Sequence, residues 1–205
     1  MKRLSLMAVL SVSAALAGCA RLIPPVPVGD PIGLNGKQLV SSALVPAAVT
    51  GDLTYSTNGS TFGDFTEKLP LDVKPTTVEF RTGFGTVDLG GACVARANPP
   101  VAKVTLQSLK VRVSDAVKAA EFSASPNASL TLTWNAAQGK YVASSEVVSI
   151  KSGASTTAAF LEVLTTGGAN QASVTATIRV DQDSLAGCTL AFTVRDPNMI
   201  LSDFR

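Results

Sequence analysis

The feature that most constrains the fold is a strict alternation of apolar and polar residues near the end of the chain. In the segment 171–180, QASVTATIRV, every second residue from Ala172 to Val180 is apolar, and the residues between are Ser, Thr or Arg. The segment 188–194, CTLAFTV, repeats the pattern. Because successive side chains of a strand point to opposite faces, a period of two predicts two half-buried strands here.

Similar signals recur through the middle of the chain. Segment 129–134 alternates, and a turn-like stretch leads from it into 140–150, which together predict a hairpin. In 101–113 the apolar phase slips near Gln107 and Ser108, as a β-bulge or a strand crossing between two sheets requires. Further strands are expected at 47–56, 76–81 and 86–94.

Two segments are ambiguous. The apolar and β-branched segment 156–164 is expected to be a strand that enters a hairpin loop, with a short buried helix as the alternative. Segment 115–122 has the length for one or two helical turns before Pro126. Many short strands with almost no long helical pattern indicate an all-β fold, an antiparallel β-sandwich (immunoglobulin-like or similar), with a β-barrel as the alternative.

The first 19 residues have a different texture. Lys2 and Arg3 give a positive start, an apolar run reaches Leu16, and small residues lead to Cys19. This order is typical of a secretory signal. The run is too short to span a bilayer, which needs roughly 18 to 20 residues.

The four residues Leu16, Ala17, Gly18 and Cys19 resemble the lipobox of bacterial lipoproteins. The resemblance covers only the leader and the cysteine. It implies that a diacylglyceryl group is attached to the Cys19 sulfur, that the chain is cut before Cys19, and that fatty acids such as palmitate hold the protein on a membrane. Ala20 is similar to the default residue of lipoproteins sent to the outer membrane. In a cell with one membrane, the expected location is its outer face.

The sequence therefore divides into three parts. Residues 1–18 are the signal peptide, 19–36 are the lipidated cysteine and a tether, and 37–205 are a single domain. Four prolines in 21–36 favour an extended spacer, because they cannot occupy the interior of a helix or a sheet. The apolar residues among them allow the alternative that the segment packs along the domain.

Composition excludes several functions. The chain has no histidine, which removes Ser-His-Asp and Cys-His catalytic systems and histidine-containing zinc sites. Three cysteines are too few for a four-cysteine zinc site. The formal net charge is +2, to which Lys2 and Arg3 contribute, so the mature domain is close to neutral and has no basic field for nucleic acid.

Cys93 and Cys188 remain for the domain once Cys19 is assigned to the membrane. An even pair in an exported chain predicts a disulfide, with two separate buried thiols as the alternative. Such a bond would join the last alternating strand to the middle of the domain.

Few residues suggest a binding or reaction site. Phe62 and Phe65 lie in a loop rich in Gly, Asn and Ser, where they could bind a partner or pack on the domain edge. Asp181 and Asp183 alternate as calcium ligands can, but they lack the rest of a calcium loop, so a polar turn is preferred. The phase of Trp134 places it in the core.

No catalytic residue, cofactor or metal is assigned from this pattern. We expect a non-catalytic structural, adhesion or binding module of the cell envelope, with an envelope protein or a glycan as the possible partner besides the membrane. A carrier of an apolar ligand between the sheets is the alternative. A hydrolase that works without histidine is the least favoured, since no two carboxylates can be paired from the sequence.

Overall fold

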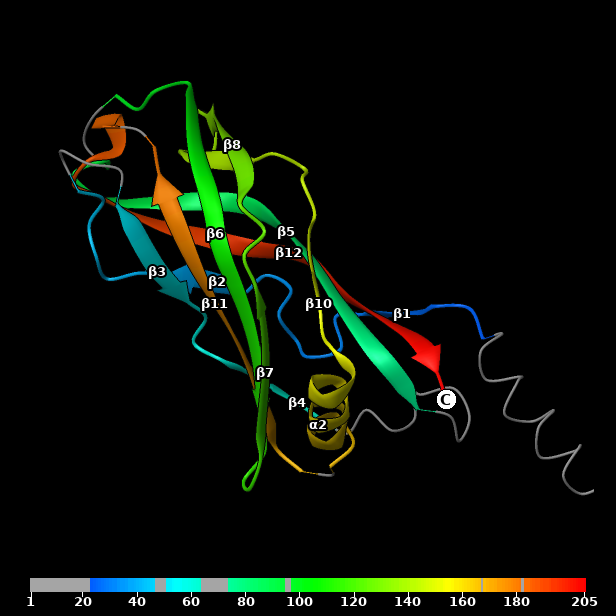
Figure 1. The fold of residues 1–205 in the computed structure, drawn as a ribbon. Coiled ribbons are helices and arrows are strands. Elements are labelled where there is room, and N and C mark those ends of the chain that lie inside the picture. Colours follow the sequence, from blue (N-terminus) through cyan, green and yellow to red (C-terminus); the bar gives the residue numbers. More distant parts are fainter. Residues whose placement is uncertain (1–22, 47–50, 64–73, 95–96, 167, 182) are drawn as a thin grey trace, which may run out of the picture.

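A computed structural model describes residues 23–46, 51–63, 74–94, 97–166, 168–181 and 183–205, and they form an antiparallel β-sandwich (Figure 1). Every strand pairing is antiparallel. The strands are β1 (Val26–Gly29), β2 (Gln38–Val40), β3 (Asp52–Ser56), β4 (Ser60–Phe62), β5 (Pro75–Gly91), β6 (Val101–Ser114), β7 (Ala119–Ala124), β8 (Ala128–Asn135), β9 (Lys140–Ala143), β10 (Val148–Lys151), β11 (Asn170–Val180) and β12 (Cys188–Phe204).

Four long strands carry the two layers. β5 pairs with β12 along most of its length, and β6 pairs with β11 (Figure 1). At one end the layers are joined through β2, β3, β8 and β9, so that the pairings close into a ring. At the other end the layers separate, and helix α2 (Ala154–Leu164) contacts β5, β6 and β7 there. The fold is thus the predicted sandwich, closed like a barrel at one end.

The predicted alternation is confirmed in both late strands. In β11 every second residue from Asn170 to Val180 is buried, and β12 alternates in the same way from Cys188 to Val194. The phase slip in β6 is also confirmed, because Gln107 falls at a register irregularity in the pairing with β11. On either side of that position β6 pairs with different strands, β8 before it and β7 after it. The bulge therefore lies where the partner on one edge of β6 changes from β8 to β7.

Segment 156–164, expected to be a strand, is instead most of helix α2. The buried residues are spaced by three or four, as one face of a helix requires. The local sequence allowed both readings, and the helix is favoured by the gap between the separating layers that it fills. Its buried residues are Thr157, Phe160, Leu161, Val163 and Leu164.

The prediction of helical turns over 115–122 is wrong. The carboxylate of Asp115 accepts hydrogen bonds from the backbone N–H groups of Val117 and Lys118, at 2.7 and 2.6 Å, which closes a tight turn. The chain then returns as β7 alongside β6, with Ala120 and Phe122 buried. Asp115 at the turn thus starts a hairpin rather than a helix.

Other strand boundaries also differ. The β8–β9 hairpin is confirmed, but its second arm ends at Ala143, and β10 pairs with β5 instead. The two strands expected at 76–81 and 86–94 are one continuous strand, β5. Only the second half of the strand expected at 47–56 is described, as β3.

The spacer expected over 19–36 is packed on the domain wherever it is described, from Ile23 on. β1 pairs with β12, Val26 lying opposite Leu201, and Ile23 packs against the core. Ile32 and Leu34 are fully buried. The alternative of a packed segment is therefore correct for 23–36, because the apolar residues between the prolines find a place in the core. No helix in the described residues is long and apolar enough to cross a membrane.

Candidate functional site

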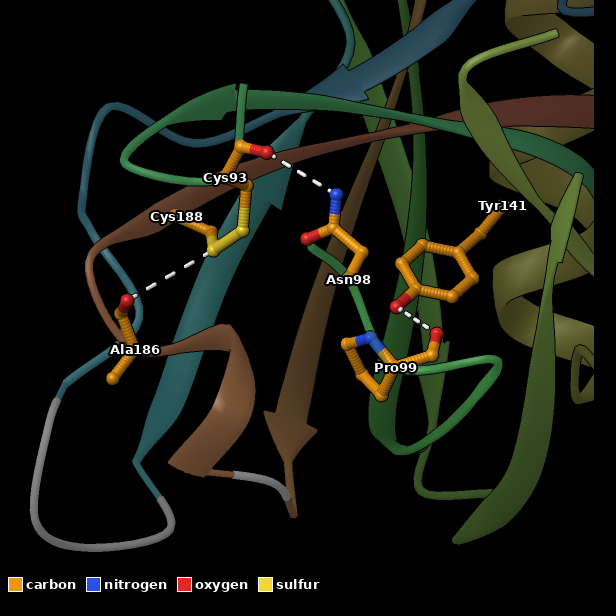
Figure 2. The surroundings of a disulfide bond; sticks show 6 residues. All are labelled: Cys93, Asn98, Pro99, Tyr141, Ala186 and Cys188. Atoms are coloured by element: carbon orange, nitrogen blue, oxygen red, sulfur yellow. Dashed lines mark hydrogen bonds between the residues drawn. A yellow bond between two sulfur atoms is a disulfide. The ribbon is translucent and has the colours of Figure 1, made fainter. Parts of the chain in front are cut away.

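The predicted disulfide is present between Cys93, just after β5, and Cys188, the first residue of β12 (Figure 2). The two Cα atoms are 5.2 Å apart, and both residues are buried. Cys188 lies opposite Gly91, two residues before Cys93, in the pairing of β12 with β5, so the bond reinforces strands that already pair. Its place at the rim of the core suits a structural role.

The loop that follows Cys93 is held by side chains. The amide nitrogen of Asn98 donates to the carbonyl oxygen of Cys93 at 3.2 Å. The hydroxyl of Tyr141 donates to the carbonyl oxygen of Pro99 at 2.7 Å (Figure 2). Trp134 lies edge-on to the Tyr141 ring, 5.1 Å between centroids, and is half-buried against the core, as its phase predicted. These aromatic residues therefore support the loop from inside.

The candidate binding loop is only partly described. Phe62 lies in β4, opposite Asn170 of β11, and packs half-buried against the core. Phe65 lies outside the described residues. The hydroxyl of Ser60 in the same strand donates to the carbonyl oxygen of Ile32 at 2.6 Å. Phe62 thus takes part in packing, and a binding role for the pair stays a prediction.

The two aspartates after β11 serve different structural purposes. Asp181 accepts a hydrogen bond from the hydroxyl of Thr105 at 3.0 Å, and Asp183 begins a short 3₁₀ turn, Asp183–Leu185. Across the parts of the chain that the structure describes, no three His, Cys, Asp or Glu residues come together as a metal site. The polar-turn interpretation fits this geometry.

A buried carboxylate that the sequence did not reveal lies on β5. Glu79 accepts a hydrogen bond from Arg81 at 2.6 Å and another from the Ser149 hydroxyl at 2.5 Å, and Lys151 lies 3.4 Å away. The hydrogen bond from Arg81, above all, lowers the pKa of Glu79 to about 2. These groups contact both carboxylate oxygens of Glu79, so the cluster fixes β10 to β5.

Two clefts on the surface of the described residues are open to solvent. One, of about 520 Å³, lies where β5 begins and β12 ends. A second, of about 390 Å³, lies between the Asp115 turn and the loop after α2. Hydrogen bonds from the backbone of Lys118 and Val117 lower the pKa of Asp115 in that turn. The larger cleft is lined by Thr76, Thr77, Ala154, Asp203, Phe204 and Arg205.

Comparison with known proteins gives little guidance. No family model matches the chain, and no curated protein does. Among solved structures, the chain is similar to TmCBM27, a carbohydrate-binding module studied for specific mannan recognition, with 8% identity, a TM-score of 0.32, and coverage of 82% of this chain and 78% of that one. It is also similar to Caldicellulosiruptor saccharolyticus CBM27-1 in complex with mannohexaose, with 13% identity, a TM-score of 0.27, and coverage of 87% and 97%. Likenesses this low carry no argument for a ligand.

The structure describes three of the predicted site residues. It brings Cys93 and Cys188 together in a disulfide and packs Phe62 against the core. Cys19 lies outside the described residues. The Glu79 cluster could not be found from the sequence, because Glu and Arg often alternate on one strand and the partner Ser149 on β10 is 70 residues away.

Proposed function

We propose that the chain is a lipid-anchored protein of the cell envelope whose β-sandwich is a non-catalytic interaction module. The observation that carries the proposal is the run of Leu16, Ala17, Gly18 and Cys19 after a charged start and a short apolar segment. Acyl chains on Cys19 would hold the protein on the membrane, since two or more chains anchor stably. With Ala20 next, the outer membrane is the proposed location in a cell with two membranes.

The disulfide supports the exported location. Cys93 and Cys188 are bonded, and such bonds persist in oxidising compartments outside the cytosol. The lipidated cysteine and the bonded pair together account for all three cysteines of the chain.

Two features favour a binding role over the alternatives. A carrier needs an enclosed apolar cavity, whereas the inner faces of the two layers are filled by packed side chains and the described clefts lie at the surface. A hydrolase needs a paired acid and base. Among the described carboxylates, Glu79 has a pKa lowered to about 2, and it is bound by Arg81 and Ser149.

The anchor is tested by mass spectrometry of the protein purified from membranes. The mature chain should begin at Cys19 and carry diacylglyceryl and acyl masses, and the protein should incorporate labelled palmitate. Cys19→Ala should abolish both the cleavage and the label. The matched control, Cys93→Ala combined with Cys188→Ala, should leave the lipid in place. A mature protein that begins elsewhere without a lipid would refute the proposal.

A further inference from the structure

Several chain segments meet at one end of the sandwich. β1 begins there, β5 begins, and β12 ends (Figure 1). Lys74 and Arg205 bond to each other through their backbones, with N···O distances of 3.1 and 3.0 Å in the two directions. Helix α2 also starts at this end, because Ala154 lines the same cleft as Thr76 and Arg205. We call this surface, from Lys74, Lys151 and Arg205 to the start of α2, the anchor end.

Very little chain separates the anchor end from Cys19. Ile23 already packs against the core, and it lies four residues after Cys19. A fully extended chain of four residues spans at most about 14 Å. By contrast, β5 has 17 residues, and a strand of that length extends about 55 Å. A lipid on Cys19 would therefore keep the anchor end at the bilayer and leave the disulfide end far from it.

Charge at the anchor end suits an anionic membrane. Lys74, Lys151 and Arg205 are exposed, and Lys151 also pairs with Glu79 at 3.4 Å. Among the described residues at this end, Asp203 is an exposed acid. Helix α2 adds the positive end of its dipole, because its N-cap is Gly153 without a side-chain hydrogen bond and its first turn holds no acidic residue. Each basic side chain near an anionic surface adds to the attraction.

The flank of the domain beside the far end of β1 has the opposite character. Asp30 and Asp196 lie together around one shallow cleft, and the Asp196 side chain, 83% exposed, has Arg195 as its neighbour at 3.5 Å. If the domain lay flat on β1, these carboxylates would approach the lipid phosphates. The charges therefore favour a domain that stands on its anchor end over one that lies on this flank.

We propose that the anchor end docks on anionic phospholipid headgroups, so that the domain stands upright and presents the Cys93–Cys188 end away from the membrane. This inference rests on the proposed lipid on Cys19. It goes further in assigning one surface of the domain to the bilayer and another to the envelope.

The orientation is measured by photo-crosslinking to lipid. The lipidated protein is placed in vesicles of phosphatidylethanolamine and phosphatidylglycerol, with benzoylphenylalanine replacing Lys74 in one sample and Val94 in another. Val94 is 74% exposed near the disulfide and serves as the far-end control. Because the two positions differ in reach from the bilayer by tens of ångströms, we expect about tenfold more lipid adduct at position 74. Equal adducts, or more at position 94, would overturn the proposal.

The headgroup preference is measured by reversing charge. Combining Lys74→Glu with Arg205→Glu should lower crosslinking from a probe that replaces Thr77 on the phosphatidylglycerol vesicles, and have little effect on pure phosphatidylcholine. Lys103→Glu, an exposed lysine of β6 outside the anchor end, is the matched control and should change neither. No change with the double variant would overturn the role of charge.

A second sample separates the docking from the lipid modification itself. The chain from Cys19 on, produced without its leader, is coupled through the Cys19 thiol to a maleimide lipid, which gives the same short connection. The bonded Cys93 and Cys188 do not react. If cells do not acylate Cys19 yet position 74 still forms the adducts, the proposed function fails and the docking stands. If cells do acylate Cys19 but position 74 has no preference in either sample, the docking fails alone.

Discussion

Protonation of Glu79 should weaken the fold at low pH. Its carboxylate joins β10 to β5 through Arg81, Ser149 and Lys151, and the side chain is only 10% exposed. These contacts hold its pKa at about 2 instead of the ordinary 4.5. Because the folded state holds the lower pKa, its stabilising effect is complete above pH 4.5 and is lost as the pH falls toward 2.

The size of the effect follows from the two pKa values. A difference from 4.5 to about 2 corresponds to at most about 3 kcal/mol. The side chains of Arg81 and Lys151 are 43% and 67% exposed, so water screens them, and we expect about 1 to 2 kcal/mol. Glu79→Gln should therefore lower the free energy of unfolding by that amount at pH 7.

Urea unfolding of the wild type and of Glu79→Gln, followed from pH 7 to pH 2, measures this directly. The gap between the two proteins should be constant above about pH 5 and should close as the pH approaches 2. Glu121→Gln is the control, since the Lys110–Glu121 pair is exposed and should contribute less than about 0.5 kcal/mol. A gap for Glu79→Gln that does not change with pH would refute the reasoning.

Two matched pairs of variants test the packing, each by urea unfolding at pH 7. Tyr141 donates a hydrogen bond of 2.7 Å, whereas the buried hydroxyl of Tyr55 has no partner among the described residues. Tyr141→Phe should therefore lower the free energy of unfolding by about 1 to 2 kcal/mol, whereas Tyr55→Phe should leave it unchanged or raise it. Equal losses of stability in the two variants would contradict this. Gly91 and Gly139 share a φ of +64°, but only at Gly91 would an added Cβ meet a backbone oxygen, at 2.6 Å. Gly139→Ala should lower the free energy of unfolding by about 1 kcal/mol, and Gly91→Ala should lower it by at least about 1 kcal/mol more. A smaller loss of stability for Gly91→Ala would contradict this and show that the backbone at Gly187 moves away from the added Cβ.

The sequence predicted what depends on local periodicity. β11 and β12 alternate because one face of each lies on the core, and that pattern is visible within ten residues. The bulge in β6 was visible for the same reason, as a change of phase at Gln107. The Cys93–Cys188 bond could be predicted from the number of cysteines together with the expectation that the chain is exported.

What the sequence did not predict depends on distant partners. Segment 156–164 became helix α2 because the gap between the separating layers needed filling, and nothing within the segment records that gap. The pKa of Glu79 is lowered first by Arg81 on the same strand, and further by Ser149 and Lys151, which reach it because β10 pairs with β5. In both cases contacts between segments far apart in the chain decided the outcome, and such contacts leave no pattern in the local sequence.

The prolines before residue 37 show how a correct local argument led to a wrong structure. Proline cannot donate to a ladder, and this favoured a free spacer. The same property permits proline in an edge strand, where one side of the backbone has no neighbour. β1 pairs with β12 on one side, and Pro27 lies opposite Ile200 there. A missing N–H in this short outer strand discourages pairing with another chain, which protects an exposed sheet edge. The prolines of β1 thus lie in the edge strand of the sheet, and the described part of this segment packs on the domain instead of forming a free spacer.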